Sequence, residues 1–163
     1  MVQHATSMIR NVKGSIEKSV YDNLKTTESI NIDFEAFPFE SGATSITEWI
    51  QLRIMDVGDP SWKPRAGSSS RGNMAPVMVS FNCFVNKENV VLANGHYRLR
   101  DVVNKYYYSG ASIPLRDYVG GTTQPWTCLM TVRDIITDMP IPNEDLNHYN
   151  YTISLEYLRE WED

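Results

Sequence analysis

The sequence predicts an α+β fold, with a mixed or antiparallel sheet of about five to six strands packed on one face by two helices. Apolar residues recur every three to four positions in two segments, which is the period of a helix with one buried face. In several other segments they recur at every second position, which is the period of a strand with one buried face. Long alternating strands of this kind favour an antiparallel or mixed sheet that is covered on one side.

The two helices are predicted over residues 7–24 and 88–107. Ser7 is a suitable N-cap for the first helix. The apolar residues of the first helix are Ile9, Val12, Ile16, Val20 and Leu24. Those of the second helix are Leu92, Gly95, Leu99, Val102, Val103 and Tyr106, and His96 is expected in the middle of that helix. Both sets lie on a single helical face, so each helix is expected to cover the sheet.

Strands are predicted over residues 30–34, 48–56, 76–85, 126–133 and 149–157, with a short strand inside "SGASIPL" (109–115). The segment "TDMPIPNED" (137–145) is predicted to be a connection broken by proline. The two periodicities together predict one core, which contains Val79, Phe81, Cys83, Leu99, Val102, Cys128, Met130, Ile153 and Leu155. Cys83 and Cys128 both fall in apolar alternating stretches, so we expect buried free thiols.

Length and charge limit the function classes. A chain of 163 residues is expected to form a single domain over residues 1–163. Its net charge of −5 argues against a general nucleic-acid binder, which needs a basic face. The sequence has no apolar run long enough for a membrane span and no secretory h-region at its start. We therefore expect a protein that is made in cytoplasm-like conditions and does not enter a membrane.

The sequence predicts no enzyme, no cofactor and no metal. His4, His96 and His148 lack the spacing of a zinc site, and the two cysteines form no CxxC pair. No nucleophile elbow and no phosphate-binding loop is present. The acids of "DFE" (33–35) and "NEDLN" (143–147) are expected to be solvated. An enzyme whose site is assembled only in space stays an alternative.

Two features are candidate contacts with a partner. The first is a flexible arm over residues 57–75, rich in Gly, Ser and Pro, which carries Trp62, Lys63, Arg65 and Arg71. Trp and Arg are enriched at binding hot spots. The second is the tyrosine run after the second helix, with Tyr107 and Tyr108. A solvated loop with a tucked tryptophan and simple packing at the helix end are the alternatives for these two features.

The order of elements resembles the tail-terminator family of long-tailed bacteriophages. The resemblance rests on a first amphipathic helix ("IRNVKGSIEKSVYDNL"), a strand with aromatics ("INIDFEAFPF") and an aromatic-led strand ("WIQLRI") ahead of a polar arm. It continues with the long strand "PVMVSFNCFV", a helix carrying "LRDVVNKYY" and the last strand "YNYTISLEY". These patterns cover nearly the whole chain, although the arm and the "TDMPIPNED" connection are longer than the family pattern.

The resemblance implies a structural virion protein, made in the host cytoplasm, that forms a homohexameric ring. Such a ring caps the tail tube, ends tail polymerisation and joins the tail to the head-completion complex. The implied partners are the chain itself, the tail tube protein and a head-completion or neck protein. DNA would pass through the pore only as cargo, and no catalysis and no cofactor are implied. The alternatives are another neck connector, such as a head-completion or stopper protein, and a small non-viral α+β binding domain.

Overall fold

The computed structural model describes residues 2–3, 9–35, 46–56, 71–87, 94–116 and 126–162. The helical elements are α1 (Ile9–Val20), a π-helical segment η2 (Tyr21–Thr27) and α2 (Gly95–Tyr106). The strands are β1 (Val2–Gln3), β2 (Ile32–Asp33), β3 (Glu48–Asp56), β4 (Arg71–Asn86), β5 (Ser112–Arg116), β6 (Trp126–Ile141) and β7 (Leu146–Glu162). The predicted α+β class is confirmed.

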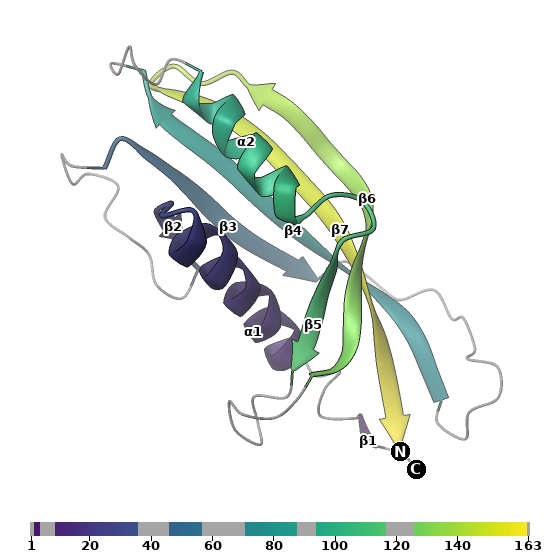
Figure 1. Cartoon of the computed structure of the whole chain (residues 1–163). Coiled ribbons are helices and arrows are strands. Elements are labelled where there is room, and N and C mark those ends of the chain that lie inside the picture. The colour runs from purple at the N-terminus through teal and green to yellow at the C-terminus, as the bar shows by residue number, and fades with distance from the viewer. Residues whose placement is uncertain are drawn as a thin grey trace.

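The strands form one mixed sheet in the order β2-β3-β4-β7-β6-β5, and β1 pairs with the end of β7. β2 runs parallel to β3, and the other pairs of neighbouring strands in the described part of the chain are antiparallel. The sheet curls into a half-barrel, and α1 and α2 both lie on the same face of it (Figure 1). None of the described helices is long and apolar enough to cross a membrane.

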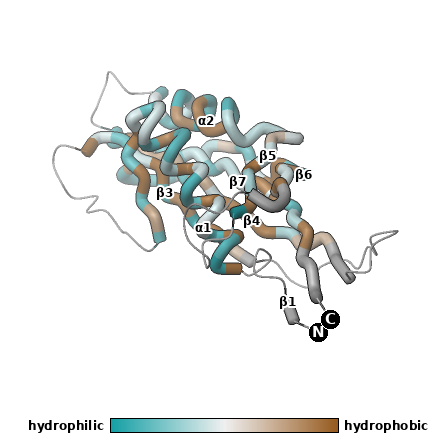
Figure 2. The backbone as a smooth tube through the Cα atoms, turned by 60° about the horizontal axis from the view of Figure 1, so that its bottom comes forward, coloured by the Kyte–Doolittle hydropathy of each residue, from teal (hydrophilic) through white to brown (hydrophobic). Residues whose placement is uncertain are grey.

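One core lies between the two helices and the sheet. Alternate residues of β4 and β7 face it, while their neighbours face the opposite side of the sheet. The hydropathy colours change accordingly along the strands in Figure 2. Seven of the nine predicted core residues are buried in this cluster: Val79, Phe81, Cys83, Leu99, Met130, Ile153 and Leu155. Val102 is only partly buried against it, and the side chain of Cys128 lies outside the described part of the structure.

The first helix buries the stripe that its sequence predicts. Val12, Ile16, Val20 and Leu24 are spaced four residues apart and are completely buried. The α-helix nevertheless ends at Val20, and the chain continues as the π-helical segment η2 to Thr27. A left-handed Ser29 (φ 58°) then reverses the chain, and Ile30 N–H donates to Leu24 O at 3.0 Å. The predicted N-cap, Ser7, lies outside the described residues.

Two boundaries that were predicted from proline and glycine content are wrong. The arm was expected to extend to residue 75, but β4 already begins at Arg71 because residues 71–76 pair with β7. Within the described residues β3 pairs with β4 only up to Val77, so Pro76 has no described partner on that side, where a residue without an N–H is tolerated. Residues 57–70 lie outside the described residues.

The proline-broken connection is also shorter than predicted. β6 continues through Thr137, Asp138, Met139 and Pro140 to Ile141, paired with β7. β5 pairs with β6 only as far as Thr131, so Pro140 lies where β6 pairs on one side only. A residue without an N–H is tolerated at such an edge. β7 is correspondingly longer than predicted at both ends.

Within the described residues, α2 covers only the later part of the predicted second helix (88–107). It starts at Gly95, so His96 lies in its first turn and not in its middle. Residues 88–93, where the predicted helix begins, are outside the described part of the chain. Its end at Tyr106 agrees with the prediction to within one residue. The short strand predicted inside "SGASIPL" is confirmed as β5.

Candidate interaction surface

The residues predicted to contact a partner do not come together in the described structure. Trp62, Lys63 and Arg65 lie outside the described residues, and Arg71 opens β4 with a side chain that is not described. Tyr108 is 53% exposed and remains available at the surface. Tyr107 is only 1% exposed, so its prediction as a contact residue is wrong.

Tyr107 is a core residue because it ends the stripe of α2. Its ring stacks on Phe81 with the ring centroids 5.1 Å apart. Its hydroxyl lies 3.0 Å from Ser19 Oγ, and Tyr151 donates to its carbonyl at 3.0 Å. Burial raises the pKa of the Tyr107 hydroxyl. The sequence carries a sign of this, because Leu99, Val103 and Tyr107 are spaced four residues apart.

The helix-free face of the sheet carries a ladder of uncharged polar side chains. Thr152 donates to Ser80 Oγ at 3.0 Å, and Asn150 Nδ2 donates to Ser80 Oγ at 3.0 Å and Asn82 Oδ1 at 2.8 Å. His148 Nε2 lies 2.9 Å from Asn82 Oδ1, and its ring stacks on Phe84. Burial lowers the pKa of His148. These groups satisfy one another, so the ladder fixes the register of β4 and β7 and does not resemble a reactive site.

Asp138 joins α2 to the sheet. Arg100 binds its carboxylate with two nitrogens, Nε donating at 2.8 Å, and Tyr149 donates its hydroxyl at 2.6 Å. The Arg100 guanidinium is the main reason why the pKa of Asp138 is lowered, and the Tyr149 hydroxyl adds to it. Burial and the neighbouring carboxylate raise the pKa of Tyr149 to about 12. These charges are paired, so we assign the network a structural role.

Asp33 departs from the prediction of solvated acids. It is 8% exposed, and Arg53 Nη2 lies 3.1 Å from its carboxylate. Glu35, Glu144 and Asp145 are exposed, as predicted. Among the described residues, no group of three or more His, Cys, Asp or Glu is placed to hold a metal ion.

The most accessible apolar side chains of the sheet lie along residues 133–141 of β6, which we call the β6 rim. Ile136 and Met139 are each 51% exposed. β5 does not reach the rim, so among the described strands the rim pairs only with β7. The register shifts between Val132 and Asp134 and between Ile135 and Thr137. Such bulges twist an edge away from unlimited pairing with other chains, while leaving its side chains available.

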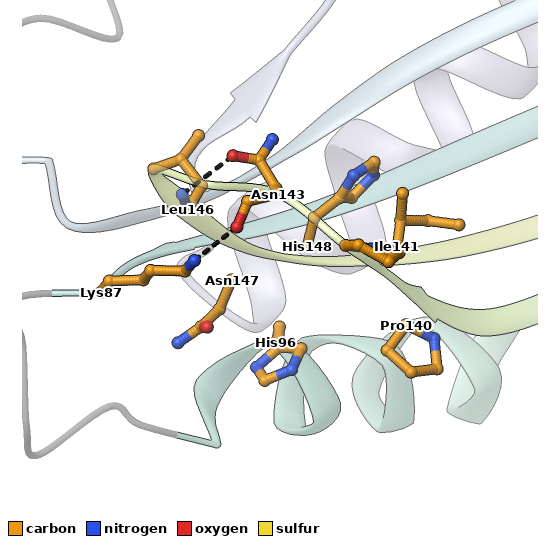
Figure 3. Close-up of a pocket in the computed structure, with 9 residues that line it drawn as sticks. Lys87, His96, Pro140, Ile141, Asn143, Leu146, Asn147 and His148 are labelled. Carbon is orange, nitrogen blue, oxygen red and sulfur yellow. Dashed lines mark hydrogen bonds between the residues drawn. The ribbon is translucent and has the colours of Figure 1, made fainter.

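A depression of about 300 Å³ adjoins the end of the β6 rim. It lies between the turn that joins β6 to β7 and the first turn of α2 (Figure 3). Its lining residues are Lys87, His96, Pro140, Ile141, Pro142, Asn143, Leu146, Asn147 and His148. His96 comes from α2, whereas His148 comes from β7 and is bonded to Asn82 on the helix-free face. The two imidazoles therefore do not form a pair of metal ligands.

Comparison with known proteins extends the description of the fold only. No family model matches the chain, and no curated protein matches it. A solved structure is similar over almost its whole length, with a TM-score of 0.61, and the alignment covers 96% of this chain and 98% of that chain. The two sequences are 12% identical, and the name of that protein describes no activity or partner. The likeness therefore shows the fold alone.

Proposed function

We propose that this chain is the subunit of a ring that caps the tail tube of a long-tailed bacteriophage and joins the tail to the head-completion complex. The observation that carries the proposal is the β6 rim. It combines a strand edge that none of the described strands covers with two half-exposed apolar side chains, Ile136 and Met139. Exposed apolar groups beside an uncovered strand edge are typical of a contact surface between subunits.

A second edge lies at the other side of the sheet. Among the described residues, β2 pairs with β3 only at Ile50 and Gln51, so the rest of this edge of β3 has no described partner strand, and Met55 there is 43% exposed. The β6 rim and the end of β3 are different surfaces. Two different surfaces on one subunit produce head-to-tail contacts, which close into a ring when the rotation between subunits allows it. The resemblance of the element order to tail terminators supports a ring of six subunits.

The experiment tests assembly and capping together. Ile136→Glu places a charge on the β6 rim, and Tyr21→Glu is a matched control because Tyr21 is also about half exposed (47%) but lies in η2. We expect the wild type and Tyr21→Glu to form six-fold caps at one end of purified tails in electron micrographs. Ile136→Glu is expected to keep the melting temperature and to lose the caps, so that tails grow to irregular lengths.

Deleting residues 61–70 tests the arm separately, because β4 begins only at Arg71. If Trp62, Lys63 and Arg65 anchor a neighbour, the deletion abolishes capping and leaves the melting transition nearly unchanged. Uniform tails with either variant would contradict the corresponding part of the proposal. Binding at the portal end instead of the tail end would indicate another neck connector, such as a stopper.

A further inference from the structure

The start of α2 carries a pair of residues that can react with each other. Of the asparagines in the sequence, only Asn94 is followed by glycine, and this pair opens the helix. Asn94 is exposed and makes no capping hydrogen bond with its side chain. The N–H of Gly95 belongs to the first helical residue, which has no acceptor within the helix, and none of the described residues accepts it. Among the described residues, the amide of Asn94 and the nitrogen of Gly95 are therefore both without a competing hydrogen bond.

The reaction open to this pair is a ring closure followed by hydrolysis. The nitrogen of Gly95, after losing its proton to hydroxide, attacks Cγ of Asn94. The N–Cγ bond forms as the Cγ–Nδ2 bond breaks, and the departing nitrogen takes a proton from water and leaves as ammonia. Water then opens the succinimide ring: cleavage at the side-chain carbonyl gives Asp, and cleavage at the backbone carbonyl gives isoaspartate. Glycine favours the closure because it has no Cβ to obstruct the approach of its nitrogen.

The folded helix opposes this ring closure. The carbonyl of Asn94 accepts hydrogen bonds from the N–H groups of Tyr97 at 3.1 Å and Arg98 at 3.3 Å, and the ψ angle of Asn94 is 18°. Closing the ring needs a rotation about the Cα–C bond of Asn94, which breaks both hydrogen bonds. Arg98 also ties this turn to β3 through its ion pair with Glu48. The terminal turn of a helix opens at a low cost in free energy, so the reaction proceeds from the opened turn.

We propose that Asn94 deamidates spontaneously in the folded protein, at a rate set by the opening of the first turn of α2. The Asp product places a negative charge at the N-cap, where it interacts favourably with the positive end of the helix and accepts hydrogen bonds from the unpaired N–H groups of the first turn. The isoaspartate product inserts a methylene group into the main chain and disrupts this turn. The inference does not depend on ring formation.

The test uses the full chain, incubated below its melting temperature at pH 7 and at pH 9. Peptide mass spectrometry with electron-transfer fragmentation distinguishes Asn, Asp and isoaspartate at position 94. We expect both products to accumulate, and to do so faster at pH 9 because the attacking nitrogen must lose its proton. Asn143 is the internal control: it is also exposed, but its Oδ1 accepts from the N–H groups of Asp145 and Leu146, each at 3.0 Å. An unmodified Asn94, Asp without isoaspartate, or equal loss of Asn143 would overturn the proposal.

Variants test the role of the first turn and the effect of the product. Arg98→Gln removes the ion pair with Glu48 from a half-exposed side chain and is expected to speed the loss of Asn94. Lys18→Gln, which removes an exposed ion pair from α1, is the matched control and should deamidate like the wild type. Equal rates in the two variants would show that opening of the turn does not set the rate. Asn94→Asp reproduces the product and should raise the melting temperature, and a lower melting temperature would contradict its capping of α2.

Discussion

The two phenylalanines of β4 provide a direct test of the sheet register. Phe81 is completely buried in the core, where its ring centroid lies 5.1 Å from that of Tyr107 and 6.5 Å from that of Tyr151. Replacing a fully buried Phe by Ala costs about 3–5 kcal/mol of unfolding free energy, because the transfer of the ring from water is lost and a cavity remains. We expect Phe81→Ala to fall in this range in urea titrations followed by tryptophan fluorescence and circular dichroism.

Phe84 is the matched control, since it has the same side chain on the opposite face of the same strand. Its ring lies on the helix-free face between Trp49 and His148, at centroid distances of 5.3 Å and 4.4 Å, and is only partly buried. Phe84→Ala is expected to cost about 1–2 kcal/mol, from partial burial and the lost ring contacts. A slip of one residue in register would exchange the two faces. Equal losses, or a larger loss for Phe84→Ala, would therefore refute the register of β4.

Two further predictions concern the thiol of Cys83 and the carboxylate of Asp138. Burial raises the pKa of the Cys83 thiol to about 12, so at pH 8 only about one thiol in ten thousand is ionised. Peptide mass spectrometry after iodoacetamide treatment should find Cys83 unmodified in the folded protein and alkylated in urea; rapid alkylation of the folded protein would contradict its burial. The pKa of Asp138 is lower in the folded protein than in the unfolded chain, so the stability it contributes is present above about pH 4 and is lost as the pH falls further. Asp138→Asn should cost about 1–2 kcal/mol at pH 7, allowing for a carboxylate that is about one-third exposed (31%), and less at pH 3. Asp101→Asn removes the more exposed partner of Arg100 (74% exposed) and should cost little at either pH, and a loss at pH 3 as large as at pH 7 would contradict the assignment for Asp138.

The sequence predicts most of the fold because burial has a strict period in this chain. On β4, Val77, Val79, Phe81, Cys83 and Val85 alternate without a break, and all five are completely buried. Alternation of this length can only come from a strand with one face on a core. The stripe of α1 is equally regular. For these segments local pattern and tertiary packing agree, so the pattern alone is sufficient.

The predicted ends of strands are wrong where pairing with a strand distant in sequence outweighs the local composition. The connection "TDMPIPNED" is predicted to be broken by proline, yet Pro140 is accommodated in β6 where β5 has already ended. The length of that neighbour is not encoded near the proline. The prediction for Asp33 is wrong for a similar reason, since this buried acid is paired in the fold with Arg53 of β3, 3.1 Å away. No spacing within the chain indicates such a pair.

The candidate surfaces were harder to predict than the core, for a different physical reason. The depression is formed by the end of β4, the start of α2 and the turn between β6 and β7, so its residues have no common period. His96 has no distinctive neighbours in sequence, and the lack of a hydrogen-bond partner for its Nδ1 is evident only in the fold. A pattern search finds groups that repeat. An isolated polar atom without a partner is found only once the chain is folded.

The β6 rim and the depression are neighbours, because Pro140 and Ile141 belong to both. A subunit that packs against the rim therefore comes close to the depression, although the two surfaces call for different chemistry. Ile136 and Met139 offer apolar area to a folded partner. The extent of the proposed contact can be tested at the edge of the depression, where Lys87 is exposed. If Lys87→Gln loses capping while Lys18→Gln, on the exposed side of α1, keeps it, the contact between subunits extends from the rim over the depression. If Lys87→Gln still caps tails, the contact is limited to the rim.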